Sequence, residues 1–105
     1  MTEPLVQKNL RDILGVNRLI HEPARLVIMT ILYSAKKADF LFLERETGLT
    51  RGNLSSHLTR LEEAGYLKIE KTFIGKTPST LCHLEKSGRK AFDEYRNQIR
   101  SAFGS

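Results

Sequence analysis

Two helix start signals and two helix stop signals lie close together in the middle of the chain. Asp39 and Thr50 are good N-caps, and Gly48 and Gly65 suit the left-handed position that ends a helix. These signals bound two expected helices, over 40–47 and 51–64. So few residues separate these helices that only a tight turn can join them. The sequence therefore predicts a helix-turn-helix.

A β-hairpin is predicted directly after the second helix. Over 66–73, three apolar positions alternate with polar ones, which is the period of a strand: Leu67, Ile69 and Phe73. Residues 74–78 include Gly and Pro and are typical of a turn, and 79–84 supply the partner strand. A hairpin that directly follows a helix-turn-helix is a wing.

The remaining segments have helical periodicity. Apolar residues recur mostly at steps of three and four over 5–20, with a break expected near Gly15. Pro23 suits the first turn of a helix over 23–34, whose circumference is mostly apolar and which we expect to be the most buried. A last helix is expected over 85–103. The 105 residues are therefore expected to form one α+β domain, mainly α. Its predicted architecture is a winged helix-turn-helix with about five helices and a two-stranded wing.

The helix over 51–64 has one apolar face and one polar face. Leu54, Leu58 and Leu61 follow at i, i+4 and i+7 and form the core face. Small polar side chains let a helix enter the major groove of DNA, which is about 12 Å wide. The candidate readers are Arg51, Gly52, Asn53, Ser55, Ser56, Thr59 and Arg60. A solvated face would have the same composition, but the flanking turn and hairpin favour DNA contact. Glu62 and Glu63, at the other end, predict insertion with the N-terminus first.

The predicted wing carries basic and hydroxyl side chains. They suit the DNA backbone or the minor groove beside the major-groove helix, and they are Lys68, Lys71, Lys76 and Thr77. Lysines also keep exposed hairpin edges soluble without binding anything. The formal net charge of +5 favours a polyanionic partner, although many proteins without such a partner are equally basic.

These segments resemble a known family. Residues 49–67, LTRGNLSSHLTRLEEAGYL, are similar to the recognition helix and following strand of ArsR/MarR-type regulators, and 19–26 and 88–92 resemble their first core helix and the opening of their last helix. The resemblance covers about 19–103 and is to the small stand-alone winged helix DNA-binding domains. It implies a homodimer on a pseudo-twofold operator. It also implies that five residues approach the major groove: Arg51, Gly52, Ser55, Ser56 and Thr59.

The chain departs from this family at two positions. Glu85 stands where relatives usually place a Thr that caps the last helix, so we expect a weaker cap here. Gly52 stands where a polar reader is often found, so base contact there is lost or made by the backbone.

The terminal helices are expected to form a dimer seam. A lone winged helix reads only a few base pairs, and two copies read successive grooves. A domain of this size has little core to absorb two further apolar stripes. The candidate seam residues are Leu10, Ile13, Leu14, Phe92, Tyr95, Ile99 and Phe103. The alternative is that both helices pack inside one monomer.

Neither catalysis nor metal binding is predicted. The chain has no phosphate-binding glycine loop and no nucleophile motif, so we expect no enzyme and no cofactor. Cys82, His21, His57 and His83 are scattered without a metal-ligand spacing. Cys82 is instead expected in the core, and His57 at a helix edge, packing there or donating to phosphate.

The expected function is sequence-specific DNA binding by a homodimeric transcription regulator, with double-stranded DNA and a second copy as partners. Repression by occupying the DNA is the simplest mechanism, and the sequence does not distinguish it from activation. No segment suggests a secretory signal or membrane span, so we expect a cytoplasmic protein. The sequence identifies no effector ligand. The alternative is a winged-helix adaptor that binds proteins and has little sequence-specific affinity for DNA.

Overall fold

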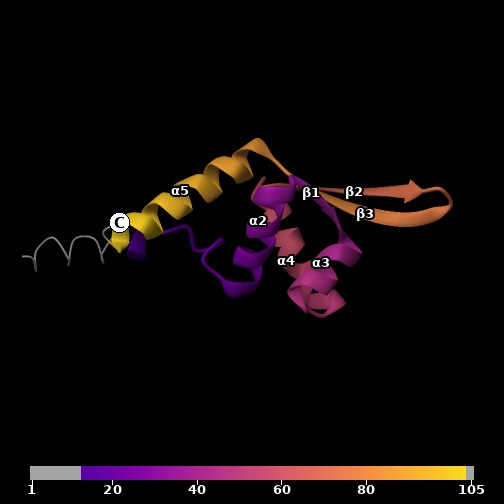
Figure 1. The fold of residues 1–105 in the computed structure, drawn as a ribbon, viewed down its shortest axis with the longest axis horizontal. Coiled ribbons are helices and arrows are strands. Elements are labelled where there is room, and N and C mark those ends of the chain that lie inside the picture. Colours follow the sequence, from indigo (N-terminus) through magenta and orange to yellow (C-terminus); the bar gives the residue numbers. More distant parts are fainter. Residues whose placement is uncertain (1–12, 104–105) are drawn as a thin grey trace, which may run out of the picture.

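The computed structural model describes residues 13–103. Within them, four α-helices and a three-stranded antiparallel sheet follow a short 3₁₀ turn (Figure 1). In chain order the elements are η1 (Ile13–Gly15), α2 (Pro23–Ala35), β1 (Lys37–Asp39), α3 (Phe40–Thr47), α4 (Arg51–Glu63), β2 (Leu67–Ile74), β3 (Thr77–Leu84) and α5 (Lys86–Ala102). This is the α+β winged helix that the sequence predicts, with the turn between α3 and α4 and the hairpin directly after α4.

The prediction of a helix over 5–20 is wrong for residues 13–20. Residues 5–12 lie outside the described residues, and after η1 the chain forms turns instead of continuing as a helix. The side chain of Asn17 accepts hydrogen bonds from the backbone N–H groups of Leu19 (3.0 Å) and Ile20 (3.2 Å). Such local bonds satisfy the backbone in a turn and compete with helix formation. The turn still buries Val16 and Ile20, so the apolar pattern reflected burial.

The sheet contains one strand more than expected. β1 pairs antiparallel with β3, placing Ala38 opposite Cys82, and the strand order is β1-β3-β2. Three residues are too few to show strand alternation, which is why the sequence does not reveal β1. The pairing ties the end of α2 to the base of the wing, and the N–H of Leu84 donates to the carbonyl of Lys36 (2.8 Å).

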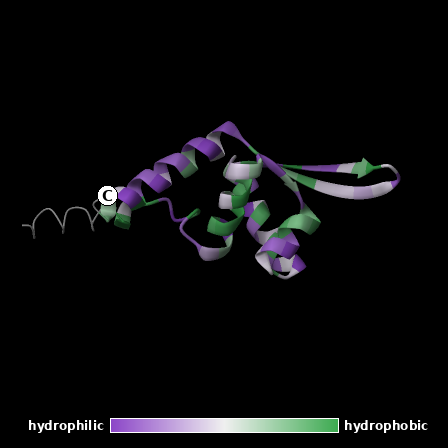
Figure 2. Ribbon diagram, in the orientation of Figure 1, coloured by the Kyte–Doolittle hydropathy of each residue, from purple (hydrophilic) through white to green (hydrophobic). Residues whose placement is uncertain are grey.

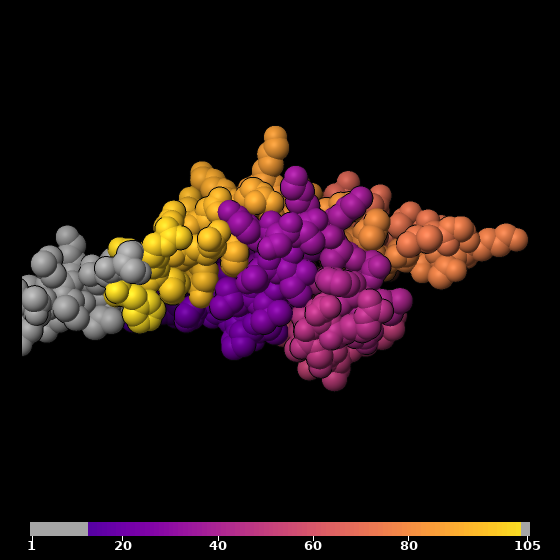
Figure 3. Space-filling view, viewed as in Figure 1, coloured from indigo at the N-terminus to yellow at the C-terminus, as the bar shows by residue number. Residues whose placement is uncertain are grey.

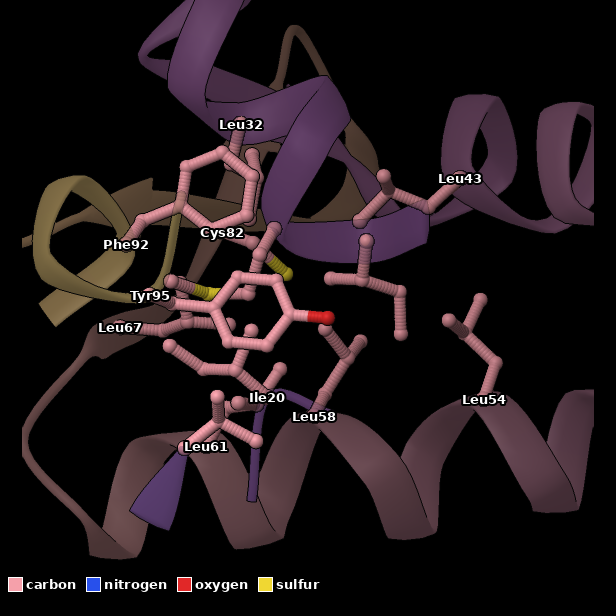
Figure 4. Close-up of a cluster of buried hydrophobic side chains, with 13 residues drawn as sticks. Ile20, Leu32, Leu43, Leu54, Leu58, Leu61, Leu67, Cys82, Phe92 and Tyr95 are labelled. Atoms are coloured by element: carbon pink, nitrogen blue, oxygen red, sulfur yellow. The ribbon is translucent and has the colours of Figure 1, made fainter. Parts of the chain in front are cut away.

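The hydrophobic core lies between α2, α4 and the base of the sheet. Figure 4 shows Leu54, Leu58 and Leu61 pointing from α4 into this cluster, as their spacing predicts. On α2 the fully buried side chains include Ile28 and Leu32. Burying a side chain of this size stabilises the fold by about 1.5–3 kcal/mol. The core therefore fixes which face of α4 is left outside.

The helix caps agree with the sequence signals. The Asp39 carboxylate accepts from the N–H of Phe42 (2.7 Å), and the Thr50 hydroxyl accepts from the N–H of Asn53 (3.2 Å). Gly48 has φ 71° and ends α3 in the left-handed conformation. Glu85 precedes α5 without a side-chain capping bond, so the weak cap expected there is confirmed.

The hairpin and α5 project toward opposite ends of the molecule (Figure 1). The space-filling view shows the hairpin as a narrow arm extending beyond the helices (Figure 3). The outer half of this arm therefore has no core to cover it. Phe73 continues the alternation of Leu67 and Ile69 in the sequence, yet its side chain is 68% exposed.

Candidate nucleic-acid interface

The outer face of α4 is an uninterrupted polar surface. The buried leucines face inward, and all seven candidate readers are exposed: Arg51, Gly52, Asn53, Ser55, Ser56, Thr59 and Arg60. Most of them have short side chains, so a binding partner can approach the backbone of α4 closely. The N-terminal turn carries Arg51 and has no acidic residue, while Glu62 and Glu63 lie at the far end. This order favours an anion at the N-terminus, where the helix dipole is positive.

Arg51 is held in place from the neighbouring helix. Its guanidinium lies 5.3 Å from the centre of the Phe40 ring, a cation–π contact between α4 and α3. Such a contact restricts a long side chain without neutralising its charge. Arg51 is thereby positioned at the opening of α4 and keeps donors for a phosphate or a guanine edge.

A buried arginine connects α4 to α2. Arg25 is only 9% exposed, and its Nε donates to the carbonyl of Leu19 (2.6 Å). One of its terminal nitrogens lies 3.0 Å from Nδ1 of His57. Since arginine only donates, Nδ1 must accept, and the ring proton then resides on Nε2. His57 is half-buried and packs at the edge of α4, as the sequence predicts.

Helical periodicity does not predict the role of Arg25, although one signal in the sequence points to it. Arg25 is the only charged residue among 23–35, in a helix that is otherwise mostly apolar. The Glu22 carboxylate caps the same helix by accepting from the N–H of Arg25 (2.8 Å). That bond is the main reason that the pKa of Glu22 lies below its ordinary value. Burial opposes the shift, and the positive charge of Arg25 adds to it.

The four candidate residues of the wing are exposed, but they lie at different positions between the base of the hairpin and its tip. Lys68 pairs with His83 at the base, Lys71 lies further out, and Lys76 and Thr77 lie at the tip. Ile74 pairs with Thr77, so only two residues turn the hairpin, and Gly75 adopts φ 66° there. A two-residue turn makes the tip narrow.

The candidate seam residues divide into two groups. Phe92 (4% exposed) and Tyr95 (6%) pack inside their own protomer, where the Phe92 ring lies 5.1 Å from that of Tyr33. Leu14 (73%) and Phe103 (69%) are exposed. The other residues are Ile13 and Ile99, which are half-buried, and Leu10, which lies outside the described residues.

Cys82 is a core residue, as expected. Its side chain is fully buried, and burial, with smaller contributions from Glu62 and Asp39, raises the pKa of its thiol to about 11. A thiol with this pKa is a poor nucleophile near neutral pH. Residues 13–103 contain no group of three or more His, Cys, Asp or Glu side chains arranged to hold a metal ion.

The chain matches a family described as "Winged helix DNA-binding domain" over residues 24–103. The chain belongs to this family. An uncharacterized protein of Methanocaldococcus jannaschii is 32% identical over 82 residues, which span 78% of this chain and 89% of that protein. The family match and the fold with its wing together confirm the predicted winged helix DNA-binding domain. This is a fold and family of transcription regulators and not of enzymes.

Solved structures of winged helix regulators share the fold. The structure of a transcriptional regulator homologue from Pyrococcus horikoshii OT3 has a TM-score of 0.82 and 28% identity, and the match covers 91% of this chain and 94% of that one. An ArsR family transcriptional regulator shares the fold at a TM-score of 0.55 and 18% identity, over 94% of each chain. The likeness to this ArsR family regulator is therefore one of fold. None of the helices within residues 13–103 is long and apolar enough to cross a bilayer.

Proposed function

We propose that this winged helix domain binds a pseudo-palindromic operator as a homodimer and represses transcription by occupying the DNA. The observation that carries the proposal is the bare, polar N-terminal half of α4, which the protein's own packing leaves open beside a basic wing. The residues that we assign to the major groove are Arg51, Gly52, Asn53, Ser55, Ser56, Thr59 and Arg60. Those assigned to the backbone or minor groove are Lys68, Lys71, Lys76 and Thr77.

The shape of the chain supports a dimer joined through its α5 end. α5 projects away from the core on the side opposite the wing (Figure 1). Leu14 and Phe103 expose large apolar side chains there, with Ile13 and Ile99 half-buried. Since Phe92 and Tyr95 are already covered within the protomer, the seam that we propose consists of the outer residues alone. A twofold axis at this end directs both wings outward, as two half-sites require.

Selection of genomic fragments by the purified protein, followed by footprinting, tests this proposal. We expect a symmetric site whose half-sites are one helical turn apart, about 34–36 Å. The affinity should fall steeply as salt rises, with a large ratio of specific to non-specific binding. Absence of any enriched sequence would contradict the proposal and favour the adaptor alternative.

Two matched variants test whether α4 forms the DNA interface. Ser56→Glu puts a negative charge on the exposed face of α4 and should abolish binding to the selected site. Ser34→Glu adds the same charge at an exposed position of α2 and should leave binding close to wild type. Both changes are at exposed helical positions, so circular dichroism should show an intact fold. Equal binding by the two variants would remove α4 from the interface.

A separate pair of measurements tests the seam. Phe103→Asp should convert the protein to a monomer in sedimentation, because an exposed apolar contact is replaced by charge. The folded core should survive, since Phe103 is 69% exposed. Repression is read from a reporter driven by a promoter that contains the selected site. A monomeric variant that represses as well as wild type would contradict the role of the dimer.

A further inference from the structure

The tip of the wing carries two large apolar side chains that nothing in the described chain covers. Phe73 is 68% exposed and Ile74 is 65% exposed, and they are the last two residues of β2. Figure 2 shows this hydrophobic end of β2 far from the apolar core. Hairpin edges are ordinarily protected by charged side chains, and an exposed apolar tip favours aggregation unless it has a binding partner.

These side chains face opposite sides of the hairpin. Successive residues of a strand point to opposite faces, so Phe73 lies on the face of Leu67 and Ile69, and Ile74 lies on the other. In the register of the hairpin, Phe73 is opposite Pro78 and Ile74 is opposite Thr77. The tip is therefore apolar on both faces. A flat protein surface would cover one face, whereas a groove with two walls covers both.

The charges around the tip select the kind of groove. Lys71 and Lys76 flank the apolar pair, and neither takes part in the ion pairs found within residues 13–103. The nearest acidic side chain, Glu70, lies 3.0 Å from Nε2 of His83 at the inner half of the hairpin. A narrow apolar blade between lysines complements a groove with apolar sugar walls and phosphate rims. The minor groove of DNA, about 6 Å wide, has this character.

We propose that Phe73 and Ile74 form an apolar wedge that enters the minor groove and partly unstacks one base step. Lys71 and Lys76 hold the phosphates on the two rims. This inference rests on the proposed function and adds an apolar, DNA-deforming contact to it. Apolar wedges of this kind open base steps and bend the duplex, which makes binding sensitive to how easily that step deforms.

The test uses the duplex that the wild-type protein selects, with 2-aminopurine placed at one base step at a time beside the major-groove footprint. Wild-type protein should raise 2-aminopurine fluorescence at one step as that base loses its stacking. Phe73→Ala should remove the fluorescence change and weaken binding roughly 10-fold or more, as expected for losing an aromatic contact with a base. Ile74→Ala should also weaken binding to this duplex.

Salt dependence separates the wedge from the lysines. Phe73→Ala should lower affinity at every salt concentration and leave the slope of log K against log salt unchanged. Lys76→Ala should reduce the magnitude of that slope by about one. Val27→Ala is the matched control: it removes an exposed apolar side chain (44%) from α2 and should bind like wild type.

Each result has one meaning. The wedge is overturned if Phe73→Ala binds as tightly as wild type, or if no step changes its fluorescence. It is also overturned if Phe73→Ala alters the oligomeric state of the free protein, because the tip would then be a contact between copies. If wild-type protein selects no duplex, the proposed function fails and the wedge with it. Selection by wild type with an indifferent Phe73→Ala rejects the wedge alone.

Discussion

Gly88 lies where α5 passes against the backbone that leads from α4 into β2. A Cβ atom at this position would lie 2.3 Å from the carbonyl oxygen of Tyr66 and 3.0 Å from a methyl group of Leu84. The same carbonyl accepts a hydrogen bond from the N–H of Glu85 (2.9 Å), which anchors the start of α5. Gly88→Ala therefore forces α5 to move away from its own anchor.

Two opposing effects set the sign of the change in stability. Replacing glycine by alanine within a helix stabilises it by up to about 1 kcal/mol. Overpacking against backbone costs roughly 1–3 kcal/mol, and weakening the Glu85 hydrogen bond costs about 1 kcal/mol more. We therefore expect Gly88→Ala to lower the free energy of unfolding by about 1–3 kcal/mol. For a domain of this size, that lowers Tm by roughly 4–20 °C.

Thermal and urea unfolding at one fixed protein concentration measure this change. Gly52→Ala is the matched control, because Gly52 is also helical and nothing lies within 4 Å of its added Cβ. We expect Gly52→Ala to raise stability by up to about 1 kcal/mol. A Gly88→Ala protein at least as stable as wild type would refute the reasoning from close approach.

Three further predictions concern caps and the buried thiol. Glu85→Thr should add the missing cap of α5 and raise the free energy of unfolding by about 1 kcal/mol in urea titrations. Glu22→Ala should cost about 1 kcal/mol at neutral pH. Because the pKa of Glu22 is lowered in the fold, its contribution is present above its ordinary pKa and is lost as pH falls through the lowered value. The difference in free energy of unfolding between Glu22→Ala and wild type should therefore become smaller as the pH of the unfolding measurement is lowered. With a pKa of about 11, native Cys82 should react with a disulfide reagent near neutral pH far more slowly than in urea, and equal rates would contradict its burial.

Local signals determined the central part of this protein. Asp39, Gly48 and Thr50 act on backbone groups within a few residues of themselves, so the tight turn between α3 and α4 follows from the sequence. The spacing of Leu54, Leu58 and Leu61 likewise sets which face of α4 is buried, because helix geometry alone brings them together. The polar candidate face for DNA follows from the same periodicity.

Contacts between distant segments decided the rest. Periodicity places Phe92 and Phe103 on one stripe of α5. Phe92 is buried because it packs against α2, whereas Phe103 lies beyond the end of that contact and is exposed. Strand alternation groups Phe73 with Ile69, and only the reach of the hairpin past the core exposes Phe73. The bond between Arg25 and His57 joins residues far apart in the chain. A sequence pattern shows which residues share a face, but burial depends on how far the neighbouring element extends, and that is set by the tertiary structure.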